Sequence, residues 1–361
     1  MHIAIDAREL TGRQTGVGRY LSELLTEWHA AGVRRRHTFS LYAHTDPPQV
    51  PPGWQDAWHV LPGAGGTRWE QWDLARALGA NRPDVLFAPG YTAPLVCPAP
   101  VALAVHDVSF FAHPEWFSRR EGVRRRLLTA WSARRARVVI APSAFSASEV
   151  VRHVGLDGGR VRLVYLAVRE PDAPPAETRE PVVLFVGSLF QRRRIDVLIH
   201  AFANLARTRP QARLEIVGEN RTTPRMDFAA TIAARGLDGR ARLRHWVDDA
   251  TLEALYAEAM VFAFLSEYEG FGLTPLEAMA RGAVPVVLDT PVAREIYGEA
   301  AVRVSDTPTL VADVATALAA LLDNAEARSR LRAAAGPVLA RYRWADAAAR
   351  TLALLEEAAG A

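Results

Sequence analysis

The chain has 361 residues, half of them hydrophobic, which is enough to bury more than one core and favours two domains. Its net charge is only +3, with all 43 basic residues arginine, so charge alone does not indicate a nucleic-acid-binding protein. The single cysteine, Cys97, excludes an intramolecular disulfide framework and fits a reducing cytoplasm, and no apolar run approaches the roughly 18 residues of a membrane span.

The first half of the chain alternates short apolar runs with helical patterns. The opening segment, M-H-I-A-I-D-A-R, has the pattern of a short strand that leads to a charge, and not that of a signal peptide. Strands are predicted at 2–5, 38–42, 85–88, 101–105 and 138–141, and helices near 18–31, 70–79 and 120–136. Because strands that alternate with helices form parallel sheets covered on both faces, this half predicts an α/β domain.

A glycine-rich segment, T-G-V-G-R-Y-L, follows the first predicted strand. Gly16 and Gly18 before a helical pattern could form half of a dinucleotide-binding fingerprint, but Leu21 stands where its third glycine belongs. An NAD-dependent dehydrogenase is therefore disfavoured. An ordinary glycine-rich turn before a helix remains the alternative.

Two polar residues, His106 and Asp107, come directly after the predicted strand at 101–105. Polar residues at the carboxyl end of a parallel strand are positioned for a ligand-binding cleft. A purely structural role for a single histidine is the alternative.

The segment 119–137 carries eight arginines against one acid, with Trp131 among them. As a helix, this segment could contact an anionic membrane or recruit a lipid-linked acceptor. An exposed basic helix with no membrane role is the alternative.

Residues 169–181 contain several prolines and no apolar run, and therefore predict a linker. The alternation then restarts, with strands predicted at 182–186, 213–217, 241–244, 261–265 and 283–288, and helices near 196–207, 227–235, 251–259 and 344–357. The predicted organisation is a domain of residues 1–170, a linker of 171–181, a domain of 182–343 and a final helix, 344–361, that can pack back on the first domain. Two such halves predict a ligand cleft between them, at the carboxyl ends of the strands.

The strand at 182–186 runs into Gly187, a turn and three successive arginines that begin with Arg192 and Arg193. A diphosphate leaving group needs fixed cations, and the guanidinium fork pairs with two phosphate oxygens at once. The alternative is a solvated basic patch.

The most informative stretch is 266–282, S-E-Y-E-G-F-G-L-T-P-L-E-A-M-A-R-G, between two predicted strands. Its start and stop signals predict a helix with Thr274 at the N-cap, Pro275 at the first helical position and Gly282 at the C-terminal end. The preceding glycines let backbone amides approach a ligand, and a helix start favours an anion. The stretch therefore predicts a site for a phosphorylated ligand.

Two carboxylates, Glu269 and Glu277, lie eight residues apart around this turn. Thr274 and Glu277 also match a capping box, in which the glutamate only returns a hydrogen bond to the threonine backbone. Glu269 could equally be a solvated loop residue.

The stretch E-G-F-G-L-T-P-L-E-A-M-A-R-G resembles the E-x7-E signature of the retaining, nucleotide-sugar-dependent glycosyltransferases of family 4. Further matches follow in the family's order along nearly the whole chain. The resemblance implies a GT-B fold, in which two Rossmann-like parallel-sheet domains face each other across a cleft. The N-terminal domain would present the acceptor, and the C-terminal domain would hold the nucleotide sugar.

The resemblance also implies roles. Glu277 would hydrogen-bond the ribose hydroxyls, Glu269 would lie against the donor sugar, and His106 would approach that sugar. Arginine followed by lysine is typical of the family where this chain has Arg192 and Arg193; since the chain has no lysine, the change is interpreted as a replacement. The expected set at the reacting centre is His106, Arg192, Arg193 and Glu269, and the expected nucleotide-sugar-binding set is Gly16, Gly18, Gly187, Gly218, Val247, Phe271, Gly272, Leu273, Thr274 and Glu277.

No D-x-D, H-x-x-H or H-E-x-x-H spacing occurs, so neither a metal site nor a cofactor is predicted. The segments T-G-V-G-R-Y and G-E-N-R-T resemble bacterial mannosyltransferases of polysaccharide assembly. The expected activity is the transfer of a sugar, with GDP-mannose as the suggested donor, to a glycan or lipid-linked saccharide. A sugar-nucleotide epimerase of the same fold and a non-catalytic nucleotide-sugar-binding protein are the alternatives.

Overall fold

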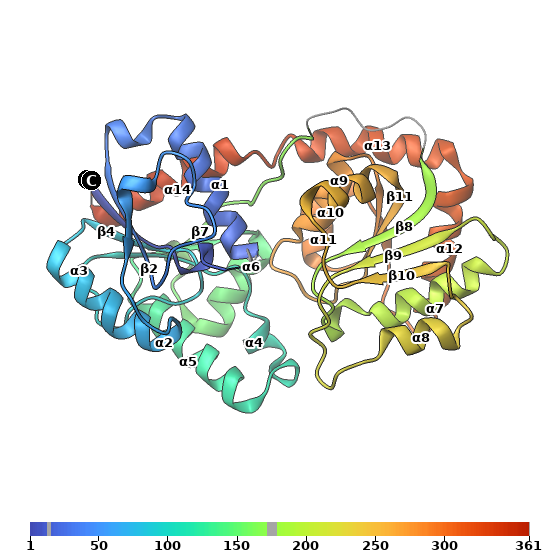
Figure 1. The fold of residues 1–361 in the computed structure, drawn as a ribbon, viewed down its shortest axis with the longest axis horizontal. Coiled ribbons are helices and arrows are strands. Elements are labelled where there is room, and N and C mark those ends of the chain that lie inside the picture. The colour runs from blue at the N-terminus through green and yellow to red at the C-terminus, as the bar shows by residue number, and fades with distance from the viewer. Residues whose placement is uncertain (13–15, 172–178, 361) are drawn as a thin grey trace. The chain divides into compact units, whose positions relative to one another are not determined.

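A computed structural model describes residues 1–12, 16–171 and 179–360. The chain divides into two compact units: Met1–Ala167 with Arg343–Ala361, and Val168–Tyr342. Each unit is a parallel sheet covered by helices (Figure 1). Of the predicted linker, residues 172–178 lie outside the described part of the chain.

The first unit contains a seven-stranded parallel sheet in the order β3-β2-β1-β4-β5-β6-β7. Its strands are β1 (His2–Asp6), β2 (Thr38–Ala43), β3 (Trp58–Val60), β4 (Val85–Ala88), β5 (Val101–Ala104), β6 (Val138–Ala141) and β7 (Val161–Leu163). Its helices are α1 (Gly16–Ala30), α2 (Gly66–Arg68), α3 (Ala75–Asn81), α4 (Ser109–Ala112), α5 (Arg119–Arg135), α6 (Ala144–Val150) and α14 (Trp344–Ala359). Strands β4, β5 and β6 are buried along their whole length, which explains why they are continuous apolar runs in the sequence.

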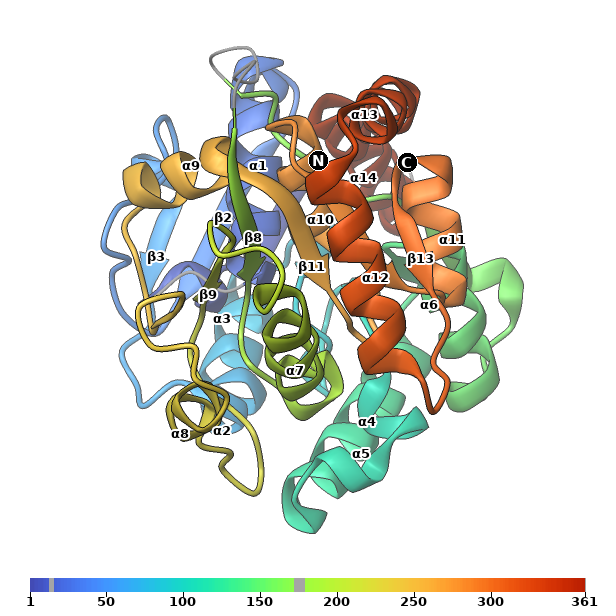
Figure 2. The same ribbon diagram turned by 90° about the vertical axis from the view of Figure 1, so that its right-hand side faces the viewer.

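The second unit contains a six-stranded parallel sheet in the order β10-β9-β8-β11-β12-β13. Its strands are β8 (Glu180–Val186), β9 (Arg213–Val217), β10 (Ala241–Arg244), β11 (Ala259–Phe264), β12 (Val284–Leu288) and β13 (Val302–Val304). Its helices are α7 (Ile195–Ala206), α8 (Phe228–Ala234), α9 (Asp249–Glu258), α10 (Leu273–Ala280), α11 (Pro291–Tyr297), α12 (Leu310–Asp323) and α13 (Ala325–Leu339). Helices α7 and α12 pack side by side (Figure 2).

Both sheets reverse their strand order once, between β1 and β4 in the first unit and between β8 and β11 in the second. At such a reversal the loops that follow the two strands turn to opposite faces of the sheet. This opens a crevice at the carboxyl ends of the strands, where doubly wound folds bind ligands. The reversal points therefore select two places for candidate sites.

The last helix, α14, belongs to the first unit and packs against α1. The indole Nε1 of Trp28 on α1 donates a hydrogen bond to the carbonyl of Ala348 on α14 at 2.9 Å. Leu355 on the inner face of α14 is completely buried. The chain thus returns to its first unit after the second is complete.

Several elements differ from the sequence prediction. The helix expected at 70–79 is a π-helical segment, η4 (Trp69–Leu74), followed by α3. The short outer strands β3, β7 and β13 were not predicted, because each has only three residues and none is fully buried. Among the described residues, no helix combines the length and apolar character needed to cross a bilayer.

Candidate functional site

An arginine and a glutamate meet at the reversal point of the second sheet. Arg193 follows β8 and Glu269 follows β11, and these two strands are neighbours. The Arg193 Nε donates to Glu269 Oε1 at 2.9 Å, and the Ser266 hydroxyl donates to the same oxygen at 2.8 Å. The structure thus brings two of the predicted site residues into one ion pair.

Gly187 makes room for this guanidinium. The Arg193 Nη1 donates to the carbonyl of Ser188 at 3.0 Å, and a Cβ atom built on Gly187 would lie 2.5 Å from that nitrogen. The guanidinium carbon also lies 5.1 Å from the centre of the Phe264 ring, within cation–π range. The Arg193 and Glu269 side chains are only 15% and 14% exposed, so the pair is held in place and not loosely solvated.

The three successive arginines have different surroundings. The Arg192 guanidinium lies over the Phe190 ring, 4.6 Å from its centre. Arg194 instead pairs with Glu267 at 2.5 Å and Asp306 at 2.8 Å. Arg194 is therefore occupied by structural ion pairs, while Arg193 faces the crevice residue Glu269.

The ends of β8 and β9 are in close backbone contact. Gly218 has φ of +155° and donates its amide to the carbonyl of Arg244 at 2.8 Å. A Cβ atom on Gly218 would lie 1.9 Å from the carbonyl oxygen of Gly187, so no side chain fits there. Val247, also expected near the nucleotide, lies half-buried between β10 and α9.

Helix α10 begins earlier than the sequence predicted. Its N-cap is Gly272, in the left-handed conformation with φ of +86°, and its first residue is Leu273. The placement of Thr274 at the N-cap and Pro275 at the first position was therefore wrong. Proline is tolerated within the first turn because amides there have no carbonyl partner inside the helix.

The predicted end of α10 at Gly282 is confirmed. Gly282 has φ of +85° and donates its amide to Met279 at 2.9 Å, and Ala283 donates to Ala278 at 2.9 Å. These two bonds form a Schellman motif, which left-handed glycine favours at a helix end.

A buried tyrosine fixes the start of α10. The Tyr297 hydroxyl donates to the carbonyl of Gly272 at 2.9 Å, and a Cβ on Gly272 would lie 1.9 Å from that hydroxyl oxygen. Burial raises the pKa of Tyr297, and the nearby Glu269 carboxylate raises it further, so the phenol stays protonated and donates. Phe271 is buried edge-on against Tyr342, with ring centres 5.3 Å apart. The first-turn amides of Leu273 and Thr274 are thereby set at the positive end of a fixed helix.

Glu277 contacts a tyrosine of α9. Its Oε2 accepts a hydrogen bond from the Tyr256 hydroxyl at 3.0 Å. The capping-box interpretation required Thr274 at the N-cap, a position that Gly272 holds. That interpretation was therefore wrong in the form predicted from the sequence.

In the first unit, His106 follows β5. Its Nε2 lies 2.7 Å from the carbonyl oxygen of Pro89, and its ring stands edge-on to Tyr20 and Tyr91. Because a carbonyl can only accept, Nε2 carries the proton, and Nδ1 of the neutral ring is an acceptor. Burial lowers the pKa of His106, opposed by the Pro89 carbonyl and the Asp107 carboxylate. The ring is thus neutral near pH ~7.

Tyr91, next to this histidine, has an unusual backbone. Its φ is +66°, and the Thr92 amide donates to the Gly90 carbonyl at 2.8 Å, which closes a three-residue turn around it. A side chain in this conformation is strained, and such strain is typically held at functional sites. The Tyr91 hydroxyl donates to Asp107 Oδ2 at 3.3 Å, so the turn fixes both members of the His106–Asp107 pair.

Both predicted glycines of the first unit lie inside α1; the helix was predicted from about residue 18, so only Gly16 was expected in a turn before it. Gly16 is the exposed first residue of the helix, and a Cβ there would meet nothing within 4 Å. Gly18 is buried in the first turn. Thr15, which opens the same segment, lies outside the described residues.

Four residues of these arrangements were missed by sequence reasoning: Ser266, Tyr256, Tyr297 and Tyr91. No local pattern marks the three tyrosines, because their partners lie 16 to 25 residues away in the chain, and Ser266, three residues from Glu269, matches no motif. Within the described ranges, no group of three or more His, Cys, Asp and Glu side chains is arranged to hold a metal ion.

Two family models match the chain. The model for glycosyl transferases group 1 matches residues 169–336, and the model for glycosyltransferase family 4 matches residues 14–170. Together they span both units.

Two curated relatives are mannosyltransferases. The chain is 29% identical over 255 residues to a GDP-mannose:cellobiosyl-diphosphopolyprenol alpha-mannosyltransferase of Komagataeibacter xylinus, covering 69% of this chain and 64% of the relative. It is 26% identical over 203 residues to the O-antigen chain mannosyltransferase RfbU of Salmonella typhimurium, covering 56% of each. The matched part thus spans between about half and two thirds of these relatives' length.

Solved structures share the fold over the whole chain. The complex of Anabaena Alr3699/HepE with UDP and glucose has a TM-score of 0.75 at 18% identity and covers 99% of this chain and 100% of that one. WaaG, a glycosyltransferase involved in lipopolysaccharide biosynthesis, has a TM-score of 0.75 at 15% identity and covers 98% and 99%. At these identities the likeness establishes the fold alone.

Proposed function

This chain belongs to the family 4-type glycosyltransferases and has their GT-B fold, and we propose that it transfers mannose from GDP-mannose to a glycan or lipid-linked saccharide with retention of configuration. The observation that carries the proposal is the Arg193–Glu269 pair at the β8/β11 reversal point, beside the fixed start of α10. Here a cation and helix amides lie where a doubly wound sheet binds a nucleotide.

The main work of the site is to stabilise the departing diphosphate. Arg193, Arg192 and the amides from Phe271 to Thr274 supply the positive charge, in a setting that needs no metal ion. In the proposed reaction the bond between the sugar C1 and the phosphate oxygen breaks, and the electron pair leaves with the nucleoside diphosphate. The acceptor oxygen bonds to C1 on the same face, and its proton passes to the departing phosphate. This route retains the anomeric configuration.

The two glutamates suit hydroxyl groups better than phosphates. A carboxylate attracts the hydroxyls of a ribose or a hexose, whereas it repels a diphosphate. We therefore assign Glu277 to the ribose and Glu269 to the donor sugar. Arg193 and Ser266 both bond to Oε1 of Glu269, and its second oxygen, Oε2, is the acceptor that we assign to a sugar hydroxyl.

His106 serves as a hydrogen-bond acceptor in this proposal, and not as a general base. Its Nε2 proton is committed to the Pro89 carbonyl, and its lowered pKa keeps Nδ1 unprotonated. A neutral Nδ1 accepts a hydrogen bond from a sugar hydroxyl.

The choice of GDP-mannose and of a lipid-linked acceptor follows from the relatives. The Komagataeibacter protein is named for GDP-mannose and a cellobiosyl-diphosphopolyprenol. With such an acceptor, the enzyme would work on the cytoplasmic side of a membrane, in peripheral contact through the segment 119–137. We propose that the nucleotide-sugar-binding set includes Gly16, Gly18, Gly187, Gly218 and Val247.

A thermal-shift panel of GDP, UDP, ADP and their sugars tests the donor. A ligand at a hundred times its Kd adds about 2.7 kcal/mol of stability, so the preferred nucleotide should stand out. GDP and GDP-mannose should give the largest shifts, and NMR of the product formed with a saccharide acceptor should show an α-mannoside. A larger shift with UDP would replace the donor assignment, and indifference to every nucleotide would end the proposal. Conversion of the donor without transfer would indicate an epimerase, and binding with neither transfer nor donor hydrolysis a non-catalytic protein.

A further inference from the structure

Tyr297 is a buried tyrosine whose hydroxyl group lies near the charged pair of the candidate site. It is the last residue of α11 and is only 2% exposed. Burial raises the pKa of Tyr297, the Glu269 carboxylate raises it further, and the Arg193 guanidinium opposes this rise. Because the effect of a charge falls with distance, the phenol lies close to both members of the ion pair.

The hydroxyl of Tyr297 contacts the residue that precedes the first helical amide of α10. It donates a hydrogen bond to the carbonyl oxygen of Gly272, the N-cap, at 2.9 Å. It also fills the space of a side chain at that position, because a Cβ atom on Gly272 would lie 1.9 Å from the hydroxyl oxygen. Since Gly272 is also left-handed, with φ of +86°, this contact requires a glycine at position 272.

The carbonyl of Gly272 and the amide of Leu273 belong to one peptide group. Such a group is planar and trans, so its N–H points in the direction opposite to its C=O. A hydrogen bond that holds the carbonyl toward Tyr297 therefore holds the Leu273 amide away from it. Pro275 has no amide proton, so the first helical turn offers its donors at Leu273 and Thr274. The Tyr297 hydroxyl thus sets the direction of the first of these two donors.

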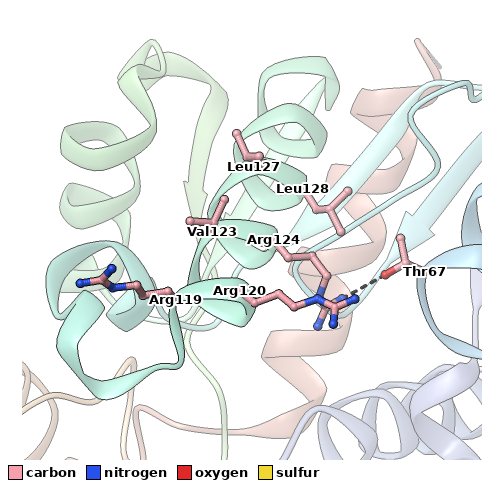
Figure 3. Close-up of a pocket in the computed structure, with 7 residues that line it drawn as sticks. All are labelled: Thr67, Arg119, Arg120, Val123, Arg124, Leu127 and Leu128. Carbon is pink, nitrogen blue, oxygen red and sulfur yellow. Dashed lines mark hydrogen bonds between the residues drawn. The ribbon is translucent and has the colours of Figure 1, made fainter.

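A fixed backbone amide differs from the exposed cationic side chains of this protein. On α5 of the first unit, Arg119 and Arg120 line an open pocket and are exposed (Figure 3). Long side chains of this kind lose conformational entropy when an anion orders them. The Leu273 amide has no such freedom, because its peptide group is held by a buried hydroxyl. Its dipole is therefore in place before negative charge develops.

We propose that Tyr297 is a positioning residue for the departing diphosphate, and that it acts through Gly272 by aiming the Leu273 amide at the phosphate oxygen that leaves the sugar. The inference rests on the proposed function, since the direction of one amide affects a rate only where negative charge develops in the reaction. Tyr297 itself does not touch the substrate in this assignment, because its hydroxyl proton is committed to the Gly272 carbonyl. A tyrosine that only stabilised the second unit would affect unfolding without a specific effect on turnover.

Tyr297→Phe tests this role, because it removes the hydroxyl group and keeps the buried ring. The assay is release of nucleoside diphosphate from whichever nucleotide sugar the wild-type protein accepts. The variant should lose about tenfold or more in kcat, because a misdirected amide forfeits part of the hundredfold or greater effect of an oxyanion donor. KM for the nucleotide sugar should change much less, since the amide contributes most in the transition state.

Tyr42→Phe is the matched control. Tyr42 is 1% exposed in the first unit, and its hydroxyl accepts a hydrogen bond from Asn81 Nδ2 at 2.8 Å. This variant also loses one hydroxyl from a buried ring, so its midpoint of urea unfolding should fall by a similar amount. Its kcat should equal that of the wild type.

A double-mutant cycle tests the route through Gly272. In the wild-type background, Gly272→Ala places a Cβ atom against the Tyr297 hydroxyl. Tyr297→Phe removes that oxygen, although the alanine remains strained at a positive φ. The loss of kcat caused by Gly272→Ala should therefore be several-fold smaller in the Tyr297→Phe background than in the wild type.

The outcomes separate this inference from the proposed function. Wild-type kcat in folded Tyr297→Phe, a loss confined to KM, or equal losses of kcat in Tyr297→Phe and Tyr42→Phe would each overturn the positioning role while the transferase proposal stands. Additive effects on kcat in the cycle would overturn the route through Gly272. A wild-type protein that neither binds nor turns over any nucleotide sugar would instead remove the proposed function, and the positioning role with it.

Discussion

Replacing Arg193 by alanine should lower kcat/KM for the nucleotide sugar by at least about a hundredfold, because a preorganised charged contact to a departing group contributes about 2–4 kcal/mol. The structure also predicts a cost in stability. The substitution removes the hydrogen bonds to Glu269 and Ser188 and the contact with the Phe264 ring. Since the pair is 14–15% exposed and Ser266 still donates to Glu269, we expect a loss of about 1–3 kcal/mol, less than for a fully buried pair.

The assay is initial-rate release of nucleoside diphosphate, with urea unfolding measured on the same preparations. Arg194→Ala is the matched control, because the neighbouring arginine is held by Glu267 and Asp306. It should lose about 1 kcal/mol of stability or less, and little activity. Arg193→Lys keeps the charge and should recover part of the rate. A folded Arg193→Ala variant with wild-type turnover would refute the proposed contact between Arg193 and the phosphates. Equal losses of activity in Arg193→Ala and Arg194→Ala would refute the assignment of catalysis to Arg193 and of a structural role to Arg194.

Three further outcomes follow from the geometry. Glu277→Gln should weaken nucleotide binding by about tenfold or more, measured by calorimetry, because it removes the charged acceptor that we assign to the ribose; a fall in melting temperature with unchanged nucleotide binding would show that the role of Glu277 is structural. Gly218→Ala should destabilise the second unit by about 2 kcal/mol or more in urea, since a Cβ would lie 1.9 Å from the Gly187 carbonyl oxygen. Burial lowers the pKa of His106, so its neutral form is favoured on folding, and stability should fall as the pH drops below the unfolded value of about 6.5. His106→Gln should lose less stability than wild type between pH ~7 and ~5, and parallel losses would contradict the buried neutral ring.

The sequence was sufficient for the fold class and for the central strands. Strands such as β4 and β6 are unbroken apolar runs because both their faces are buried, so their continuous apolar character and short length identify them. The outer strands β3 and β13 carry no such signal, since side chains there are partly solvated. The order of strands within each sheet was not readable either, because it depends on contacts between distant segments.

For the candidate site, the sequence supplied the residue types but not their partners. The resemblance to family 4 selected Arg193 and Glu269, which are 76 residues apart, yet only the strand order brings them to one reversal point. The start of α10 was misplaced because Thr274 and Pro275 carry the usual start signals, whereas the helix begins at Leu273 after the N-cap Gly272, whose carbonyl accepts a hydrogen bond from Tyr297. A tertiary contact that fixes the conformation of the glycine before a helix therefore determines where the helix starts, even when local start signals favour a later residue.

The arginine that stands where the family typically has lysine is explained by its neighbours. A lysine ammonium is a single flexible point charge, whereas the planar guanidinium of Arg193 reaches Glu269 with Nε and the Ser188 carbonyl with Nη1 at the same time. The Arg193 Nη1 lies where a side chain on Gly187 would be, and the face of the Phe264 ring lies against the same guanidinium. A bulkier cation is therefore accommodated by a missing Cβ, and its position is fixed before any ligand arrives. Preorganised charge stabilises a developing anion without reorganisation at the moment of reaction. A fixed arginine can therefore stabilise the departing diphosphate at once, whereas a mobile lysine would first have to be oriented.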